Sequence, residues 1–452
     1  MPTPGARQST LSAFRAPLTI FWTGLLIRVL YITIAHTYRF SPFEDHFTFG
    51  YEMARVARAL VTGFGYADPF SGHTGPTSWV PPLYPLLIAA VFKLTGVYAP
   101  LSAWILLTLN SVFSAATALA VYEIAARCYN RKVALWSAWI WALYPAAMQY
   151  ATRWVWETSL TTFLFTAVLV LALRMRAVGE AAPEPKRQTT SQWLLFALLW
   201  ALIALSNSTL LLFLPVCGIW LLIGSNKLSA PPSRSKAEPK WVPRSAYLVR
   251  AILAATLFLA CIAPWIYRNW IALHAFIPMR SNLGAELYAG NGPGSYGFRY
   301  GALIGLPEQD AQHRLYVRLG EIAYVKQRGE LAKAWIRAHP ERFITLSLKR
   351  FYFFWASVPH PSDKHWLLDF VRQVNYCLPS ITGILGLVLS LRQRIPASGL
   401  FTWAFVLLPV TYYFVTVEAR FRHPLEPLIV IFSVYLFQSA TSHPRAKTLL
   451  SS

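Results

Sequence analysis

The sequence predicts an all-α integral membrane protein, built as a bundle of about ten transmembrane helices. Hydrophobic residues make up 55% of the 452 residues, whereas charged residues make up only 13%. Apolar runs of about 20 residues, the length that crosses a hydrocarbon core of about 30 Å, recur along the chain. Most basic residues lie in short segments between these runs, which is typical of cytoplasmic loops in a multi-pass membrane protein.

The first expected span runs from Leu18 to Thr37 and follows a basic segment, so we place the N-terminus in the cytoplasm. Further spans are expected at residues 101–122, 133–150, 158–173, 248–266, 376–391, 401–417 and 425–437. Residues 193–223 are interpreted as a hairpin of two spans that turns at Ser206, Asn207 and Ser208. Alternate crossings then put both termini and the basic linkers in the cytoplasm.

We expect the chain to have three parts. Residues 1–267 form an N-terminal transmembrane module that includes a first outer loop at 38–82. Residues 268–375 form a periplasmic loop region, and residues 376–452 supply the C-terminal transmembrane helices. Because both polar regions border apolar runs, juxtamembrane helices are expected on the outer face in the first loop and in the late periplasmic loop.

Helix-like apolar spacing indicates such helices at Phe47–Val61 and Ala311–Lys333. The segment Phe343–Ala356 is apolar enough for a span, but Lys349 and Arg350 lie in its middle. Each charge at the centre of a bilayer costs roughly 2.5–3.5 kcal/mol on insertion scales. We therefore expect this segment also to lie at the membrane interface.

The net charge of +22 does not indicate a nucleic-acid partner, because the basic residues are spread over loops between apolar runs. Membrane lipids are the partners that this pattern predicts. The four cysteines are far apart in sequence and show neither metal-ligand spacing nor a disulfide framework.

The first outer loop concentrates acidic residues. Residues 40–83 hold four of the chain's 19 acidic residues, namely Glu44, Asp45, Glu52 and Asp68. Asp45 and Glu52 would share one face of a helix, and Glu157 in the next outward loop could meet them. Paired carboxylates can hold a divalent cation, or one can deprotonate a hydroxyl that the other orients. The alternatives are a solvated loop and acidic capping of an interfacial helix.

A second cluster is basic and is also expected on the outer side. Arg420, Arg422 and His423 lie between the last two apolar runs, where the positive-inside tendency disfavours them. Guanidinium groups at a helix end are suited to contact a phosphate through two hydrogen bonds. Arg153 and Arg268 occupy similar boundaries. The alternative is that these side chains reach toward lipid headgroups.

A third pattern suggests contacts with a substrate. The run GAELYAGNGPGSYG, residues 284–297, contains glycines that let a backbone approach a phosphate or sugar closely. Tryptophans line the expected outer boundary, either as an interfacial belt or as surfaces for sugar rings. From these segments we select Asn291, Trp79 and Tyr84 as candidate substrate-binding residues. A structured turn would explain the glycines equally well.

The order of several motifs resembles that of bacterial GT-C glycosyltransferases, the group of protein mannosyltransferases and lipid A aminoarabinose transferases (glycosyltransferase family 39-like). The motifs are ARALVTGFGY, PTSWVPPLYPLLIAAVFKLTG, ALYPAAMQYATRWVWE, APWIYRNW, FIPMRSNLGAELYAGNGP and ARFRHPLEPL. The resemblance implies a GT-C-like fold and transfer of a sugar from a polyprenyl-phosphate carrier outside the membrane. It also implies that an acidic residue of the first outer loop acts as the base.

Two departures from the family pattern bear on the site. The family usually has Asp-Glu in the first loop, whereas this chain has Glu44-Asp45, so the base stays open among Glu44, Asp45 and Glu52. Related enzymes often carry Lys or Arg just before the Pro-Pro pair, where this chain has Val80. We therefore expect the arginines near the C-terminus, Arg420 and Arg422, to bind the carrier phosphate.

The expected function is an inner-membrane glycosyltransferase that acts on the periplasmic face, with a lipid, glycan or protein as acceptor. The predicted catalytic residues are Asp45, Glu44, Glu52 and, in support, Glu157. The predicted carrier-phosphate ligands are Arg420, Arg422, His423, Arg268 and Arg153. The need for a divalent cation is left open. The rival functions are a lipid or sugar transporter or flippase, and a non-catalytic assembly protein, which would leave the acidic loop without a pocket.

Overall fold

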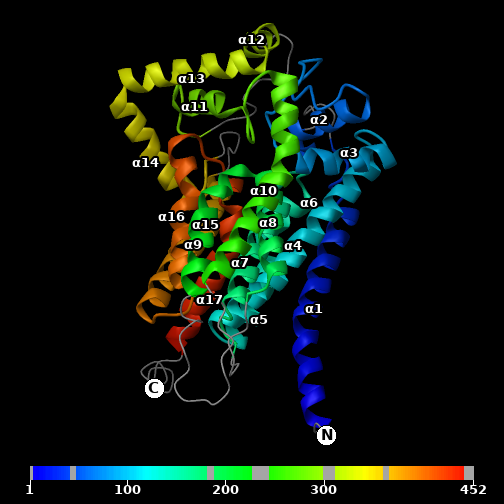
Figure 1. The fold of residues 1–452 in the computed structure, drawn as a ribbon. Coiled ribbons are helices and arrows are strands. Elements are labelled where there is room, and N and C mark those ends of the chain that lie inside the picture. Colours follow the sequence, from blue (N-terminus) through cyan, green and yellow to red (C-terminus); the bar gives the residue numbers. More distant parts are fainter. Residues whose placement is uncertain are drawn as a thin grey trace.

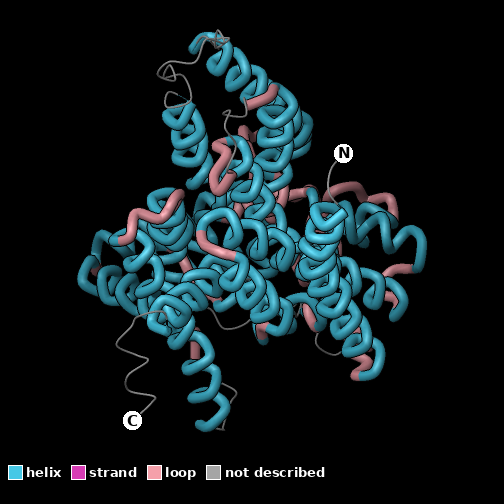
Figure 2. The backbone as a smooth tube through the Cα atoms, turned by 90° about the horizontal axis from the view of Figure 1, so that it is seen from below, coloured by secondary structure: helices cyan, strands magenta, loops and turns pink. Residues whose placement is uncertain are grey.

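The computed structural model describes residues 4–40, 47–180, 188–225, 244–298, 311–359 and 366–441. Within these ranges the regular elements are helices, together with one isolated bridge between Ala67 and Pro76. Figures 1 and 2 show these helices in two perpendicular views, joined mostly by short loops. The predicted all-α membrane fold is confirmed.

Five helices in the described part are long and apolar enough to cross a membrane, as expected of a multi-pass membrane protein. They are α1 (Pro4–Ile34), α4 (Pro100–Cys128), α7 (Thr158–Met175), α10 (Arg244–Leu273) and α15 (Trp366–Arg392). Shorter helices complete the bundle: α3 (Leu83–Thr95), α5 (Arg131–Leu143), α6 (Pro145–Thr152), α8 (Thr190–Ala204), η3 (Ser208–Phe213), α9 (Leu214–Ser225), α16 (Ser398–Phe414), η4 (Ala419–Leu425) and α17 (Glu426–Thr441).

A polar cap covers one end of the bundle. We define it as η2 (Phe47–Phe49), α2 (Glu52–Val61), α11 (Leu283–Asn291), α12 (Ala311–Leu319) and α13 (Glu321–Ala338). The helix α14 (Pro340–Ala356) leads from the cap back to the bundle and packs against α16. Figure 1 shows the cap at the top, whereas the start of α1 and the end of α17 lie at the opposite end.

Three segments expected to be continuous helices are each divided. The segment Phe47–Val61 forms η2 and α2, which are separated by Gly50 and Tyr51, both with positive φ. The segment 133–150 forms α5 and α6, which are separated at Tyr144 because Pro145 has no N–H to donate to the preceding turn. Close to this break, Arg28 of α1 donates a hydrogen bond of 2.8 Å to the carbonyl of Ala142. The expected helix in 311–333 forms α12 and α13, which meet at Gly320, where φ is +73°.

The helix α14 shows how the structure accommodates a charge in an apolar segment. Arg350 is fully buried, and its guanidinium group donates to the carbonyl oxygens of Tyr413 and Gly290 and to the side chain of Asn291. These contacts tie α14 to α11 and α16. Two of its three nitrogen atoms are therefore paired inside the protein, and the charge does not face lipid.

The helices α15 and α17 approach closely because α15 carries glycines at the contact. A Cβ atom on Gly386 would lie 2.1 Å from the carbonyl oxygen of Phe432, and one on Gly383 would lie 2.9 Å from the side chain of Ile429. Small residues at such contacts are the usual means by which membrane helices pack without a hydrophobic driving force between them.

We predict that Gly386→Ala lowers the free energy of unfolding by roughly 1–3 kcal/mol, because the added methyl group meets backbone that cannot move away without separating the helices. Thermal unfolding of the purified protein in detergent measures the change. Gly399→Ala in α16 is the matched control, since no atom lies within 4 Å of the added Cβ. Equal melting temperatures for Gly386→Ala and the parent would contradict the close contact.

Candidate active site

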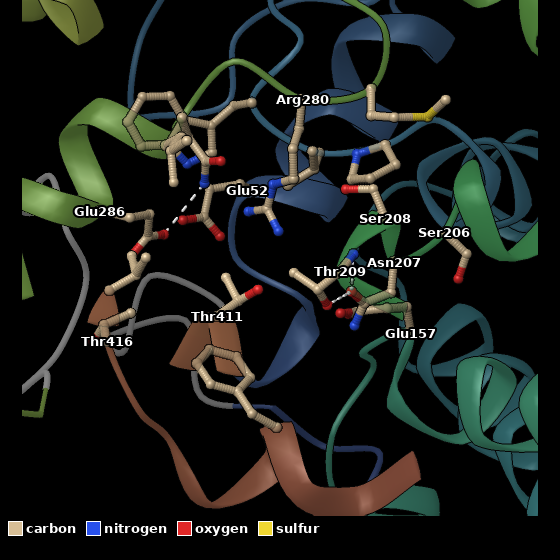
Figure 3. A pocket seen from close by; sticks show the side chains of 18 of the residues that line it. Glu52, Glu157, Ser206, Asn207, Ser208, Thr209, Arg280, Glu286, Thr411 and Thr416 are labelled. Atoms are coloured by element: carbon tan, nitrogen blue, oxygen red, sulfur yellow. Dashed lines mark hydrogen bonds between the residues drawn. The ribbon is translucent and has the colours of Figure 1, made fainter. Parts of the chain in front are cut away.

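A cavity of about 290 Å³ lies between the polar cap and the bundle, close to the lower end of the range for small-molecule sites. Five charged side chains line it: Glu52, Glu157, Glu286, Arg280 and Arg420. Figure 3 shows Arg280 extending into the space between Glu52 and Glu286 on one side and Glu157 on the other. Segments far apart in the sequence therefore meet around one cavity.

The remaining lining is apolar, aromatic or uncharged polar. It consists of Met53, Trp79, Val80, Pro81, Trp156, Ser206, Asn207, Ser208, Thr209, Pro278, Met279, Asn282, Leu283, Thr411, Tyr412, Val415, Thr416 and Phe421. A cavity with apolar walls and a few converging polar groups is the usual form of a binding site for a small molecule or a cofactor.

Each charged group sits at the end of a helix or in a short connection. Glu52 is the first residue of α2 and is buried there, and Glu157 immediately precedes α7. Arg280 lies in the connection between α10 and α11, Glu286 lies in the first turn of α11, and Arg420 lies in η4. Helix ends can present polar side chains without placing them inside an apolar span.

A buried carboxylate holds two of the lining segments in place. Glu321 of α13 accepts hydrogen bonds from the hydroxyl of Thr77, from the backbone N–H of Ser78 at 2.8 Å and from the hydroxyl of Ser281 at 2.7 Å. The Tyr316 hydroxyl also donates to Glu321, at 2.9 Å. Because Ser78 precedes Trp79 and Ser281 follows Arg280, this network positions both cavity residues.

Arg420 is held in a defined orientation. Its Nε donates to Glu418 at 2.7 Å, and its guanidinium carbon lies 3.8 Å from the ring centroid of Trp156. A guanidinium group over an indole ring is attracted electrostatically to the face of the ring. The flat group is therefore oriented before any ligand binds.

Arg280 differs from Arg420 in its partners. Its Nε is buried and has no hydrogen-bond partner, and no ion pair of Arg280 is formed with the residues that the structure describes. A buried donor without a partner costs about 1–3 kcal/mol. The cavity therefore contains a cationic group whose hydrogen-bonding capacity is available to an anionic ligand.

Glu157 experiences two opposing influences. Burial raises the pKa of this carboxyl, while the charges of Arg420 and Arg280 lower it and the charge of Glu418 raises it further. Burial is the largest influence, so the pKa is above that of a free glutamate. The Oε2 atom of Glu157 is excluded from solvent and has no hydrogen-bond partner in the described part of the chain. This environment favours the neutral acid.

The structure brings four of the predicted site residues to the cavity: Glu52, Glu157, Arg420 and Trp79. The predicted Glu44 and Asp45 lie outside the described residues. Trp79 is 1% exposed and its ring lies nearly perpendicular to that of Phe70, so burial leaves little of its surface available for stacking on a sugar.

Arg422 and His423 do not line the cavity, which differs from the expectation that they bind the carrier phosphate. Both are buried in the bundle and pair with Glu426, at 3.2 Å for Arg422 and 2.5 Å for His423. Arg422 also donates to the hydroxyl of Ser380 at 2.7 Å. The charge of Arg422 and the hydrogen bonds of both side chains hold η4 against the neighbouring helices.

The two other predicted arginines also lie away from the cavity lining. Arg268 donates hydrogen bonds to the backbone carbonyl oxygens of Thr77 and Tyr66. It therefore stabilises the loop between these two residues, which precedes Trp79. Arg153 is exposed and donates to the hydroxyl of Tyr31 at 3.0 Å through Nε.

The predicted substrate ligands Asn291 and Tyr84 serve internal contacts. The amide of Asn291 donates to the carbonyl oxygens of Leu287 and Phe414, each at 3.1 Å. The Tyr84 hydroxyl donates to Asn110 at 2.9 Å and is buried. Neither side chain lines the cavity.

Arg280, Glu286 and Asn207 were not singled out as site residues from the sequence. Arg280 and Glu286 lie within the motif FIPMRSNLGAELYAGNGP, and Asn207 lies in a predicted turn between two apolar runs. The motif was the available signal for the first two, but nothing in their spacing distinguishes them from the other charged residues of the loop.

The described residues contain no group of three or more His, Cys, Asp or Glu side chains that could hold a metal ion. The carboxylates of Glu44 and Asp45, for which a divalent cation was left open, are outside that search.

Comparison with known proteins agrees with the motif series. The model of the family "Dolichyl-phosphate-mannose-protein mannosyltransferase" matches residues 79–233, about a third of the chain. The chain resembles this glycosyltransferase family. The matched segment includes Trp79, Glu157 and the turn at Ser206–Thr209, so it contributes one side of the cavity. No curated protein sequence matches the chain.

Among solved structures, the chain is similar to the Archaeoglobus fulgidus oligosaccharyltransferase tethered to an acceptor peptide, with a TM-score of 0.47 and 12% identity over 94% of this chain and 49% of that one. The oligosaccharyltransferase AglB of the same organism, in complex with an inhibitory peptide and a dolichol-phosphate, gives 0.45 and 12% over 96% and 51%. ArnT from Cupriavidus metallidurans bound to undecaprenyl phosphate gives 0.38 and 12% over 94% and 78%. The chain spans about half the length of the oligosaccharyltransferases it matches.

We predict that Glu157 makes the stability of the folded protein fall as the pH rises. Its raised pKa means that the folded state keeps the proton to higher pH than the unfolded chain, whose glutamate pKa is about 4.3. Stability is therefore greatest below about pH 4 for this group and is lost as the pH rises through the folded pKa.

Glu157→Gln removes this proton, so its melting temperature relative to the parent should rise as the pH increases above about 4 and passes through the folded pKa of Glu157. Thermal unfolding in detergent measures the difference, and an infrared carboxylic-acid band absent from the variant would report the proton directly. Glu330→Gln, at an exposed site paired with Lys333, is the control. A difference that does not change with pH would show that Glu157 titrates as a free side chain.

Proposed function

We propose that the protein is a membrane glycosyltransferase that moves a sugar from a polyprenyl-phosphate-linked donor to a lipid, glycan or protein acceptor. The observation that carries the proposal is the cavity between the polar cap and the apolar bundle, where two arginines and three glutamates converge. A lipid-linked phosphate needs apolar surroundings for its chain and cationic groups for its headgroup at the same depth. The family match over residues 79–233 supports the same activity.

Arg280 and Arg420 are proposed to hold the carrier phosphate. Both guanidinium groups line the cavity, and such groups bind phosphate oxygens through paired, charge-assisted hydrogen bonds. Arg280 has donor capacity that no described residue uses. Arg422 and His423, by contrast, are proposed to hold η4 in place through Glu426.

Glu52 is proposed as the base among the described carboxylates, with Glu44 and Asp45 as the candidates outside them. The acceptor hydroxyl gives its proton to the carboxylate, and its oxygen forms a bond to the anomeric carbon of the sugar. The bond from that carbon to the phosphate oxygen breaks, and its electron pair stays on the phosphate. Attack from the side opposite the phosphate inverts the configuration of the anomeric carbon.

Glu157 is proposed to support the reaction rather than to act as its base. Burial raises the pKa of this carboxyl, and in its protonated form it can donate a hydrogen bond to the substrate.

The cavity is proposed to open to the periplasmic face of the inner membrane, with both termini in the cytoplasm. The argument is the positive-inside tendency of the basic linkers. We keep the three-part division in this proposal with one change, because η2 and α2 of residues 1–267 belong to the cap. Residues 268–375 contribute α11–α13 to the cap and contain α14, which returns the chain to the bundle.

The first test concerns the base. Glu52→Gln keeps the shape of the side chain but cannot accept a proton, so turnover should fall by about 10²–10⁴-fold while carrier binding stays unchanged. The assay is single-turnover release of polyprenyl phosphate from polyprenyl-phosphate mannose, with a membrane lipid extract as the acceptor source. Glu157→Gln is the matched variant and should lose less. A parent-like rate for Glu52→Gln would exclude Glu52 as the base.

The second test concerns the phosphate. Arg280→Ala and Arg420→Ala should each weaken binding of polyprenyl phosphate by roughly 30- to 4,000-fold, corresponding to about 2–5 kcal/mol for truncating one partner of a desolvated charge contact. Binding to the protein in lipid nanodiscs measures the loss. Arg153→Ala, an exposed arginine that contacts Tyr31, is the matched control. Unchanged affinity in both cavity variants would overturn the phosphate assignment.

The same measurement separates Arg422 from the cavity arginines. Arg422→Ala leaves the buried Glu426 without its arginine partner, which typically costs about 3–5 kcal/mol of stability. We therefore expect this variant to unfold at a lower temperature, while the protein that remains folded binds polyprenyl phosphate with parental affinity.

The turnover assay also separates a glycosyltransferase from a transporter. A transporter would bind the carrier equally well but would release no free polyprenyl phosphate from the sugar-linked donor.

A further inference from the structure

One wall of the cavity carries no charge and is built from the turn between α8 and η3. Ser206, Asn207, Ser208 and Thr209 are four consecutive polar residues between two apolar helices, and all four line the cavity. Figure 3 shows Asn207 and Thr209 close to Glu157, at a distance from Glu52 and Glu286 on the other side. Polar residues in an apolar bundle are costly and are retained mainly where they serve function.

Hydrogen bonds within the turn determine which way the Asn207 amide faces. The backbone N–H of Thr209 points at one amide atom of Asn207 at 3.3 Å, and an N–H can only donate, so that atom is the oxygen Oδ1. The Thr209 hydroxyl also donates to Oδ1, at 2.5 Å. Since this uses the only proton of Thr209, the Tyr412 hydroxyl must donate to Thr209 at 2.7 Å.

This chain of hydrogen bonds leaves donor capacity on the amide nitrogen of Asn207. Both lone pairs of Oδ1 are occupied, whereas Nδ2 has two N–H groups. One of them can be directed at the Tyr412 hydroxyl, which interacts with the Asn207 side chain, so the other is open to the cavity that Asn207 lines. Nearby, Ser206 is 97% buried and its hydroxyl oxygen has no partner in the described part of the chain. A ligand that carries hydroxyl groups would supply partners for both groups.

The distribution of charge indicates which part of a donor fits here. If the phosphate lies on Arg280 and Arg420, the group next to the uncharged wall must be neutral and able to accept hydrogen bonds. We propose that the turn Ser206–Thr209 recognises the sugar of the donor, with Asn207 Nδ2 donating to a sugar hydroxyl oxygen. Thr209 and Tyr412 are positioning residues that orient the amide. The inference rests on the proposed function and adds the residues that select the sugar.

A site that hydrogen-bonds a particular hydroxyl rejects ligands that lack it, because its own polar groups are then left unpaired. The turn should therefore distinguish sugars that differ in the configuration of one hydroxyl. An apolar wall of the same shape would distinguish them only weakly.

The test uses Asn207→Ser in lipid nanodiscs. Serine can still cap η3 by accepting from the Thr209 N–H, but it lacks the amide nitrogen. The probes are bare polyprenyl phosphate and polyprenyl phosphates that carry glucose, mannose or galactose. Mannose and galactose each differ from glucose in the configuration of one hydroxyl. The parent should prefer one sugar by at least about tenfold in Kd, and the variant should narrow that preference to within about threefold. The affinity of both proteins for bare polyprenyl phosphate should be equal.

Asn130→Ser is the matched control, because Asn130 caps α5 by accepting from the N–H of Val133 at 2.9 Å and does not line the cavity. It should keep the parental sugar preference. Thr209→Val, which removes the hydroxyl that orients the amide, should weaken the preference without changing the affinity for bare polyprenyl phosphate. Thermal unfolding of each variant separates these effects from a loss of structure.

Three results would overturn the inference. The first is an Asn207→Ser variant that keeps the full sugar preference, and the second is a variant that binds bare polyprenyl phosphate as weakly as the sugar-linked forms. The third is a parent that binds the carrier but does not distinguish the three sugars, which would leave the carrier assignment intact. A parent that binds no polyprenyl phosphate at all would refute the proposed function, and the sugar assignment with it.

Discussion

The geometry of the cavity depends on the buried carboxylate of Glu321. It joins the loop before α3, through Thr77 and Ser78, to the connection before α11, through Ser281. A carboxylate that accepts several hydrogen bonds from different segments holds them together, since an unpaired buried charge would be far more costly than any single contact. Because Trp79 and Arg280 are neighbours of these anchored residues, the cap and the bundle meet in one defined arrangement.

The basic segment in η4 illustrates how neighbouring residues take different roles. Arg420 lines the cavity and lies over the ring of Trp156, whereas Arg422 and His423 enter the bundle and pair with Glu426. The internal ion pair holds the segment, and the held segment presents Arg420. A cluster of basic residues that looks uniform in sequence therefore combines a group that faces the cavity with the residues that hold it in place.

Much of the fold and part of the candidate site could be predicted from the sequence. The apolar runs indicated the membrane bundle. The alternation of spans predicted that Glu52, Glu157 and Arg420 lie at the same end of it, and in the structure they line one cavity. The prediction did not separate Arg420 from Arg422, because both have the same charge and nearly the same sequence environment. It also did not single out Arg280, whose proposed role depends on its place in the cavity and on an Nε atom that no described residue pairs.

Hydrophobic length is a local property, since the transfer free energy of each residue adds along a run, and for this reason the sequence alone determined the all-α membrane class. The positions of helix breaks were harder to predict from the sequence. Pro145 lies within the expected span 133–150, but only the structure shows that the helix is interrupted there. The partners of each polar group were decided by tertiary structure. Whether Asn207, Arg280 or Arg422 meets a ligand or another side chain depends on segments that lie far away in sequence, and hydrogen bonds act only over the short distances that packing creates.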